Sequence, residues 1–292
     1  MNPEKPILLD GGMGRELKRV GAPFRQPEWS ALALIEAPET VVEVHRRFVA
    51  AGCDIITTNN YAVVPFHLGD ARFELEGEAL SELAARLARE AATGDVRVAG
   101  SLPPLSGSYR PDLYDAERAA TLYPRIIAAM APHVDLWIAE TVSCLDEAEA
   151  ICAALTARDK PLWLSFTVDD ALDNGARLRS GESIESACAL AIKHKVDTVL
   201  FNCSVPEAIG AAIALVQQLD SNLSTYGGYA NAFTPRPKDT EANAVTAALR
   251  DEITPTAYAD MVMQWVDYGA RVVGGCCGVG PDHIAALRTR LG

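Results

Sequence analysis

The sequence predicts a (β/α)8 barrel, and two observations carry the prediction. Eight short runs rich in apolar and β-branched residues alternate with eight longer amphipathic segments along the 292 residues. The short runs are almost continuously apolar, which is typical of strands buried on both faces of a parallel sheet. Eight strands that are each followed by a helix indicate a barrel. Because α/β barrels of this length are commonly one domain, we expect residues 1–292 to form a single barrel domain.

Each element is predicted from its own local pattern. The expected strands are residues 7–10, 53–59, 96–101, 134–140, 161–167, 196–202, 222–229 and 271–275. The expected helices are residues 38–51, 74–93, 115–131, 145–158, 182–194, 206–219, 255–268 and 281–291. Several of these helices open with a helix-start signal, in which proline precedes an acidic residue, as in Pro38-Glu39 and Pro281-Asp282.

The alternative fold is a doubly wound open sheet. Such a sheet commonly has a glycine loop with GxGxxG spacing after its first strand, and GGMG at residues 11–14 lacks that spacing. The least regular segments are residues 230–253 and 101–114. Both follow expected strands, so in a barrel they lie over the face that carries the active site, where long loops are commonly lids or binding loops.

The charge balance argues against several classes of partner. The chain has 26 Lys and Arg against 39 Asp and Glu, which gives a net charge of −13 and disfavours binding to nucleic acid or an anionic membrane. The sequence contains no apolar run of about 18 residues, as a membrane span requires, and no signal-peptide pattern before Asp10. We therefore expect a cytosolic protein, in which thiols stay reduced. The seven cysteines are then interpreted as metal ligands, nucleophiles or core residues.

The most informative motif is Gly274-Gly275-Cys276-Cys277-Gly278, at the end of the eighth expected strand. Neighbouring side chains of a strand point to opposite faces, so both cysteines can bind one ion only where the chain leaves strand geometry, as the glycines allow. Cys203 directly follows the sixth expected strand. In a barrel the ends of strands six and eight lie on the same rim, one strand apart. We therefore expect the three thiols to converge.

Three converging cysteines are typical of a metal ion that keeps one position open. His283 is close in sequence, but we expect it on the last helix and not as a ligand. Three thiolates offset the charge of Zn²⁺ and make it a poor activator of water, whereas they suit the capture of a substrate thiol as thiolate. This chemistry indicates alkyl transfer to sulfur. The alternative is that the three cysteines are small buried apolar residues. Such a core role is what we expect for the other four: Cys53, Cys144, Cys152 and Cys188.

Three motifs, LLDGGMGREL, FNC and GGCCG, resemble in matching order those of the homocysteine S-methyltransferase family. This family includes betaine–homocysteine and S-methylmethionine–homocysteine methyltransferases, and the resemblance covers nearly the whole chain. It implies a (β/α)8 barrel in which Cys203, Cys276 and Cys277 bind zinc. It also implies that the sulfur of homocysteine completes the tetrahedron and that methionine is the product.

The resemblance implies a binding site for the rest of homocysteine as well. Asp10 and Glu140, which end the first and fourth expected strands, match the carboxylates that bind its amino group. The amides of Gly11 and Gly12 can meet its carboxylate. Without the resemblance, a turn role explains Asp10 equally well. Glu140 is less easily explained as a solvated surface residue, because a carboxylate that ends an apolar strand is costly to bury unless it is paired.

Three further residues belong to the expected substrate site. Trp29 and Tyr61 resemble aromatic residues of the methyl-donor pocket in the betaine branch, where an aromatic face holds an onium group by cation–π attraction. Ordinary packing is the alternative for both. Asn231, after the seventh expected strand, is expected to bridge homocysteine or the methyl donor. In the betaine branch a tyrosine follows the strand-four glutamate, and Thr141 stands here instead, which favours the S-methylmethionine branch.

The sequence therefore predicts direct transfer of a methyl group from a small onium donor, with S-methylmethionine favoured, to the zinc-bound thiolate of homocysteine. Betaine, dimethylsulfoniopropionate and a related acceptor thiol remain alternatives. A zinc-dependent lyase or hydrolase is a further alternative, but it needs a group that activates water, and no strand end supplies a histidine. A non-catalytic protein that binds zinc or thiols is the last alternative. The sequence does not indicate the oligomeric state.

Overall fold

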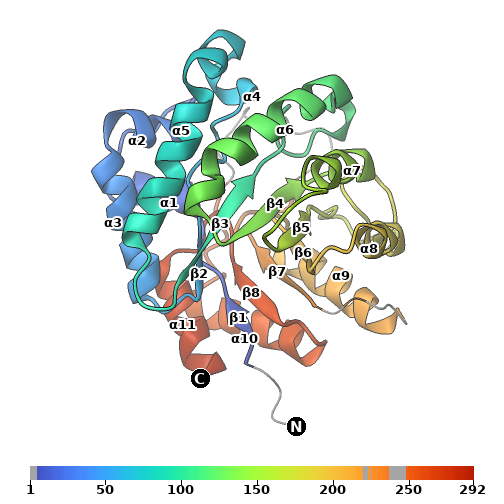
Figure 1. Ribbon diagram of the computed structural model, residues 1–292. Coiled ribbons are helices and arrows are strands. Elements are labelled where there is room, and N and C mark those ends of the chain that lie inside the picture. Colours follow the sequence, from blue (N-terminus) through green and yellow to red (C-terminus); the bar gives the residue numbers. More distant parts are fainter. Residues whose placement is uncertain (1–4, 220–222, 224, 237–247) are drawn as a thin grey trace.

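The computed structural model describes residues 5–219, 223, 225–236 and 248–292 (Figure 1). Its strands are β1 (Ile7–Leu8), β2 (Ile55–Thr57), β3 (Arg97–Leu102), β4 (Leu136–Val142), β5 (Leu162–Phe166), β6 (Thr198–Asn202), β7 (Tyr226–Ala230) and β8 (Val272–Gly275). One longer helix follows each strand: α3 (Pro38–Ala50), α5 (Asp70–Ala91), α6 (Ala116–Met130), α7 (Leu145–Ala154), α8 (Ile184–Lys193), α9 (Pro206–Gln218), α10 (Pro255–Asp267) and α11 (Pro281–Leu291). Shorter elements lie in the connections: α1 (Met13–Arg19), α2 (Ala31–Glu36), α4 (Pro65–Leu68), η1 (Pro111–Leu113) and η2 (Ala131–His133).

The eight strands form one parallel sheet in the order β1-β8-β7-β6-β5-β4-β3-β2. The sheet closes between β1 and β2, where Leu9 and Ile55 form a parallel bridge. The amide of Asp10 donates to the carbonyl of Ile55 at 3.0 Å and continues this closure to the rim. The predicted (β/α)8 barrel is therefore confirmed, and a doubly wound open sheet is excluded by the closed ladder.

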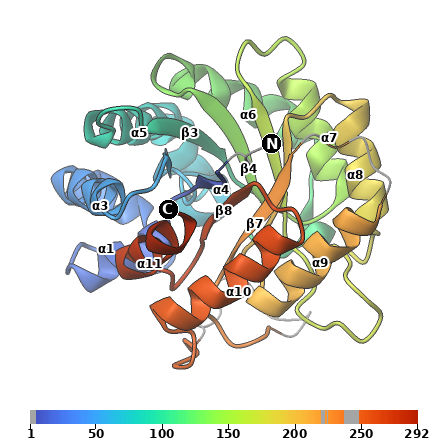
Figure 2. The same ribbon diagram turned by 90° about the horizontal axis from the view of Figure 1, so that it is seen from below.

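The hydrophobic core has two parts. Side chains that point into the barrel form a small inner cluster, which includes Leu136, Ile138 and Leu200. A much larger cluster fills the space between the strands and the surrounding helices, and Figure 2 shows those helices encircling the strands. Every residue of β5 and β6 is buried, as the continuously apolar runs predict for strands covered on both faces.

The predicted strands and long helices are all present, with ends that differ by a few residues. The helix predicted at 74–93 begins earlier, at Asp70, directly after Gly69, which has φ 77°. Residues 222 and 224 of the seventh predicted strand, and residues 237–247 of the irregular segment 230–253, lie outside the described residues. The short helices α1, α2 and α4 were not predicted, because four to seven residues are too few for a helical period to be recognised.

Within the described part of the chain, no helix combines the length and the apolar character that crossing a bilayer would require.

Candidate active site

A cavity of about 170 Å³ opens at the carboxyl ends of the barrel strands. Its lining comes from the segments after β1, β2, β3, β6, β7 and β8 and from the end of β4. This is the face of a (β/α)8 barrel on which active sites lie. An engineered cavity of similar size, about 150 Å³, holds benzene, so the site suits small molecules. The two irregular segments contribute as expected, with Tyr109 from one and Phe233 from the other.

Two kinds of local irregularity gather around this cavity. Of the five described non-glycine residues with positive φ, four line it: Trp29, Tyr109, Thr141 and Cys203. Such backbone strain is concentrated at functional sites. Three buried polar atoms of the lining have no hydrogen-bond partner among the described residues: Nε1 of Trp29, the hydroxyl of Tyr229 and Nε of Arg236. Because buried polar groups are normally paired, the cavity has the polarity of a ligand site.

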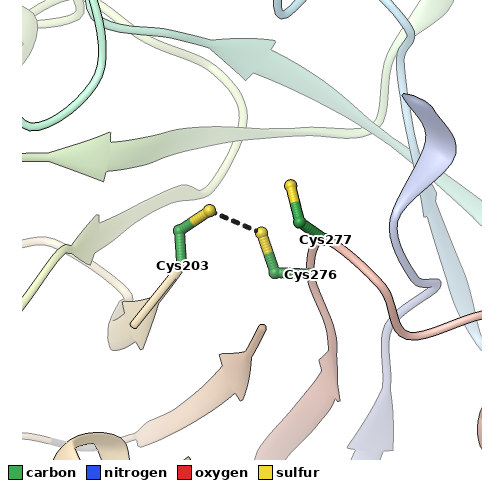
Figure 3. A group of neighbouring side chains, drawn as sticks. All are labelled: Cys203, Cys276 and Cys277. Atoms are coloured by element: carbon green, nitrogen blue, oxygen red, sulfur yellow. Dashed lines mark hydrogen bonds between the residues drawn. The ribbon is translucent and has the colours of Figure 1, made fainter. Parts of the chain in front are cut away.

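The three predicted cysteines lie together in this cavity (Figure 3). The amide of Cys203 donates to Tyr229 O at 3.3 Å and that of Cys276 to Ala230 O at 2.9 Å, so the central strand β7 anchors both. The φ of 55° at Cys203 turns its side chain toward the β8 loop. Gly278, with φ 86°, reverses the chain after Cys277.

The sulfur atoms fit one metal ion. All three Sγ atoms lie within 4.8 Å of one another, and the described residues hold no other cluster of three such ligands. Zn–S bonds of about 2.3 Å place two ligands at most about 4.6 Å apart, so small side-chain adjustments suffice. Cys203 Sγ and Cys276 Sγ are 2.9 Å apart, which is well beyond the about 2.05 Å of a disulfide.

Cys277 is the most acidic thiol of the cluster. Hydrogen bonds from Cys203 and Cys276 lower its pKa well below the ordinary value, and the guanidinium groups of Arg236 and Arg15 lower it further. The same shared protons raise the pKa of Cys276. A thiolate is the form that binds a metal, so the cluster is electrostatically prepared for a cation.

The two predicted carboxylates lie in the same cavity. Asp10 accepts hydrogen bonds from the amide of Thr57 at 2.8 Å and from its hydroxyl at 3.2 Å. Glu140 accepts one from the hydroxyl of Ser101 at 2.5 Å. Burial, opposed by the bonds from Thr57 and reinforced by the charge of Glu140, raises the pKa of Asp10 to about 8. Burial, opposed by the bond from Ser101 and reinforced by Cys203, raises the pKa of Glu140 to about 7.

The described part of the chain supplies no cation to the carboxylates of Asp10 and Glu140, which form an acidic pair. Among the described residues, no Lys, Arg or His forms an ion pair with Asp10 or Glu140 (the ion pairs found there join other side chains). Asp10 is buried and Glu140 is half-buried, so the two neighbouring carboxylates repel each other and lose hydration. A bound ammonium group would relieve both penalties, so the pair suits the amino group of a small substrate.

Glu140 does not end its strand, in contrast to the sequence prediction. β4 runs on to Val142, and its pairing with β5 shifts register between Ala139 and Val142. Such a bulge breaks the alternation of faces, and both Glu140 and its neighbour Thr141 therefore line the cavity. Asn202 holds the bulge, because its side chain accepts from the amide of Thr141 at 2.9 Å and donates to its hydroxyl at 3.0 Å.

Gly11 and Gly12 line the cavity through close backbone approach. A Cβ on Gly11 would lie 2.3 Å from the carbonyl oxygen of Val279, and one on Gly12 would lie 2.5 Å from that of Cys276. The amide of Gly12 donates to Val279 O at 2.9 Å. This bond ties the β1 loop to the cysteine loop and occupies the single N–H of Gly12, so in this structure that amide serves the loop and does not face a substrate carboxylate as a free donor.

The two predicted aromatic residues line the cavity from the β1 and β2 loops. Trp29 packs edge-on against Phe24 and His67, with ring centroids 5.5 and 6.4 Å away. The hydroxyl of Tyr61 pairs with that of Ser108 at 2.6 Å. These rings form an aromatic wall of the cavity, and that wall suits an apolar or cationic group.

Asn231 is the one predicted site residue that does not line the cavity. It is buried, and its side-chain oxygen accepts from the amide of Phe233 at 3.0 Å, which shapes the turn after β7. His283 is directed away from the cysteines, as expected, with Nε2 3.0 Å from Ile253 O. The four remaining cysteines are buried and lie outside the three-cysteine cluster, as predicted: Cys53, Cys144, Cys152 and Cys188.

Sequence reasoning did not identify several residues of the site. Thr57 and Ser101 hold the two carboxylates, and Tyr109 donates through its hydroxyl to Cys203 O at 3.1 Å. Arg15 and Arg236 line the cavity close to Cys277. Two of these residues had a positional signal: Ser101 ends the expected strand 96–101, and Arg15 lies within LLDGGMGREL. The other residues have no spacing that marks them.

A family model described as homocysteine S-methyltransferase matches residues 7–291. The chain belongs to the homocysteine S-methyltransferase family. The methyltransferase is 30% identical over 306 residues to the homocysteine S-methyltransferase of Escherichia coli K12, with 97% of this chain and 94% of that protein covered. It is 28% identical to the selenocysteine methyltransferase of Astragalus bisulcatus, with 97% and 91% covered.

The fold of this methyltransferase is also that of a solved relative. The metallated form of the E. coli homocysteine methyltransferase MmuM superposes with a TM-score of 0.81 at 29% identity, covering 99% of this chain and 97% of that one. In this structure the cysteine cluster, the acidic pair and the aromatic wall all line one cavity.

Proposed function

We propose that this methyltransferase transfers a methyl group from a small onium donor, S-methylmethionine or a similar sulfonium, to the thiolate of homocysteine and forms methionine. The observation that carries the proposal is that one small cavity holds three sulfur ligands together with the carboxylates of buried Asp10 and half-buried Glu140, which form no ion pair with any described residue. The three sulfur atoms suit a metal ion that binds the thiol of homocysteine, and the two carboxylates suit the amino group of the same molecule.

Cys203, Cys276 and Cys277 would hold the zinc ion. Zinc bound there would lower the pKa of the homocysteine thiol and keep it as thiolate at neutral pH. Three protein ligands leave one position for the substrate, as in catalytic zinc sites. The proposal assumes a reducing compartment such as the cytosol, in which the three cysteines stay thiols.

Asp10 and Glu140 orient homocysteine through its ammonium group. In free enzyme near pH 7 both carboxyls are partly protonated, because burial raises the pKa to about 8 for Asp10 and about 7 for Glu140. An ammonium group between them favours their ionised forms. The backbone and hydroxyl of Thr57 and the hydroxyl of Ser101 fix the oxygens that face it.

The aromatic wall would bind the methyl donor. A sulfonium lies against the faces of Trp29 and Tyr61 by cation–π attraction, and the wall excludes water from the reacting groups. The new sulfur–carbon bond forms as the old one breaks, and a neutral thioether leaves. Thr141 in place of the betaine-branch tyrosine leaves this wall one ring short, which favours sulfonium donors over betaine.

A panel of methyl donors tests the proposal. Zinc-loaded enzyme is incubated with homocysteine and S-methylmethionine, betaine or dimethylsulfoniopropionate, and methionine is quantified. We expect methionine with S-methylmethionine at the highest kcat/KM. Absence of methionine with every donor would refute the proposed function. Since a relative of this chain is named for selenocysteine, the panel includes selenocysteine as a second acceptor, a specific alternative within the same chemistry.

A further inference from the structure

We propose that Arg15 and Arg236 form a carboxylate-binding end of the cavity that recognises the α-carboxylate of an amino-acid substrate. The inference rests on the proposed function, because it assigns a second recognition site to the same reaction. The carboxylate belongs either to homocysteine or to S-methylmethionine as the methyl donor, because both are α-amino acids and carry the same α-carboxylate. Arg15 lies within the motif LLDGGMGREL, whereas no motif marks Arg236.

Two separate segments bring the arginines together. Arg15 lies in the first turn of α1, and Arg236 follows β7. Their guanidinium carbons lie 5.1 and 4.9 Å from the ring centre of Phe233, so both stack on one side chain of the cavity lining. Arg236 also stacks on Tyr109 at 5.1 Å. This aromatic sandwich holds its guanidinium in place.

Arg236 has unused hydrogen-bonding capacity. Its Nε is buried and has no partner among the described residues. Arg179 stacks on the same Tyr109 at 5.0 Å, and its Nε and Nη2 likewise have no hydrogen-bond partner among the described residues. It differs from Arg236 in that its guanidinium lies 3.4 Å from a carboxylate oxygen of Asp170 and outside the cavity lining. That oxygen also accepts from the backbone amide of Arg236 at 2.9 Å, whereas the guanidinium of Arg236 lines the substrate cavity.

The two positive charges are close enough to oppose each other. Burial lowers the pKa of Arg15, and the charge of Arg236 lowers it further, while the Cys277 thiolate acts in the opposite direction. Two half-buried cations that contact the same ring and repel each other favour a nearby anion. A guanidinium presents a planar fork of donors that matches a carboxylate, so a carboxylate suits this position better than a neutral group.

The cavity consequently has an acidic and a basic region. Asp10 and Glu140 suit an ammonium group, and Arg15 and Arg236 suit a carboxylate. An α-amino acid carries both groups on one carbon, and only a substrate that carries both can contact both regions. The competing explanation is that the arginines only neutralise the cysteine cluster, since both lower the pKa of Cys277. The two explanations differ in whether the substrate carboxylate matters.

Matched substrate pairs separate these explanations. Homocysteine is compared with 3-amino-1-propanethiol, and S-methylmethionine with (3-aminopropyl)dimethylsulfonium; each second compound lacks only the carboxylate. The enzymes are wild type, Arg236→Met, Arg15→Met and Arg236→Lys, with Arg177→Met as a control because Arg177 is exposed and outside the cavity. Methionine keeps the apolar stem that packs on the rings and removes the charge.

Calorimetry on zinc-loaded protein gives the dissociation constants, and kcat/KM is measured in parallel. We expect wild type to prefer the carboxylate-bearing member of one pair, and Arg236→Met to reduce that preference about 10- to 100-fold. Binding of the carboxylate-free member should change little, and Arg236→Lys should restore part of the preference. A change in the homocysteine pair assigns the carboxylate to the acceptor, and a change in the sulfonium pair assigns it to the methyl donor.

Two outcomes would overturn the inference. One is that Arg236→Met and Arg15→Met weaken binding of both members of each substrate pair equally, and the other is that neither variant changes the preference for the carboxylate-bearing member. Zinc content and melting temperature establish that each variant is folded and loaded, and Arg15→Met carries the same expectation if Arg236→Met does not fold. Failure of the proposed function has a different signature, because wild-type enzyme would then form no methionine with any methyl donor. A wild-type enzyme that forms methionine without carboxylate preference contradicts only the inference.

Discussion

Replacing Glu140 with glutamine separates a substrate-binding carboxylate from a structural one. In wild type, Oε1 of Glu140 accepts a hydrogen bond from the Ser101 hydroxyl at 2.5 Å. The glutamine amide keeps the shape of the side chain and an oxygen that can accept this bond, but it removes the negative charge. A buried charge-assisted hydrogen bond contributes about 1.5–3 kcal/mol, so homocysteine affinity should weaken about 10- to 150-fold. Zinc content should stay near that of wild type, because Glu140 is not part of the cysteine cluster.

The same variant has a stability signature with a definite sign. Burial raises the pKa of Glu140 to about 7, against 4.5 for a free glutamate, so the unfolded chain releases this proton at lower pH than the folded chain. Wild type therefore loses stability as pH rises from about 4.5 to about 7, by up to about 3 kcal/mol. Glu140→Gln should match wild type near pH 5 and be equally or more stable at pH 8.

Melting temperatures at the two pH values, zinc content and the homocysteine dependence of activity together constitute the assay. The matched control is Glu149→Gln, because Glu149 is a surface carboxylate paired with Lys193 and His194 and lies outside the cavity. A Glu140→Gln enzyme that melts at lower temperature at pH 8 while it binds homocysteine normally would refute the substrate-binding role.

Three other expectations follow from the site and the core. Wild type should bind about one zinc ion per chain, and Cys276→Ala should lose most of this zinc together with activity, as metal analysis and a methionine assay would detect. A variant that retains both its zinc and its activity would exclude the cysteine site. S-methylmethionine should have a higher kcat/KM than betaine because Thr141 replaces the betaine-branch tyrosine, and equal or better use of betaine contradicts that assignment. His45 is fully buried, both of its ring nitrogens lack a partner among the described residues, and burial lowers its pKa to about 3. Below about pH 6.5 the imidazole gains a proton in the unfolded chain, whereas in the folded chain it stays neutral. The free energy of unfolding therefore falls as the pH is lowered, by about 2 kcal/mol at pH 5. His45→Leu should therefore lose less unfolding free energy between pH 7 and pH 5 than wild type, as urea titrations measure; an identical loss contradicts the argument.

The barrel was predictable because its signals are long and repeated. The runs that became β5 and β6 are apolar throughout, and proline starts α3, α9 and α11 as expected. Predicting closure required only the count of eight strands, each followed by a helix. The convergence of Cys203 with Cys276 and Cys277 then followed from topology, because β7 alone separates β6 from β8.

Local geometry was harder to predict from sequence. The bulge that brings both Glu140 and Thr141 to the cavity depends on Asn202, which is 61 residues away, and no local pattern encodes such a contact. Asn231 follows β7 as a substrate residue would, yet its side chain caps the turn at Phe233. The clustering of Arg15 and Arg236 on Phe233 depends on the packing of two distant loops.

The zinc dependence of a single turnover tests the central claim most directly. Metal-free and zinc-reconstituted protein are each mixed with unlabelled S-methylmethionine and with homocysteine that carries deuterium on its carbon chain. Mass spectrometry then follows chain-labelled methionine, which forms only from homocysteine, whereas the methionine released from the donor is unlabelled. The account predicts labelled methionine, up to about one per active site in the first turnover, from the zinc-reconstituted protein alone. Equal formation of labelled methionine by protein that retains no metal would contradict it.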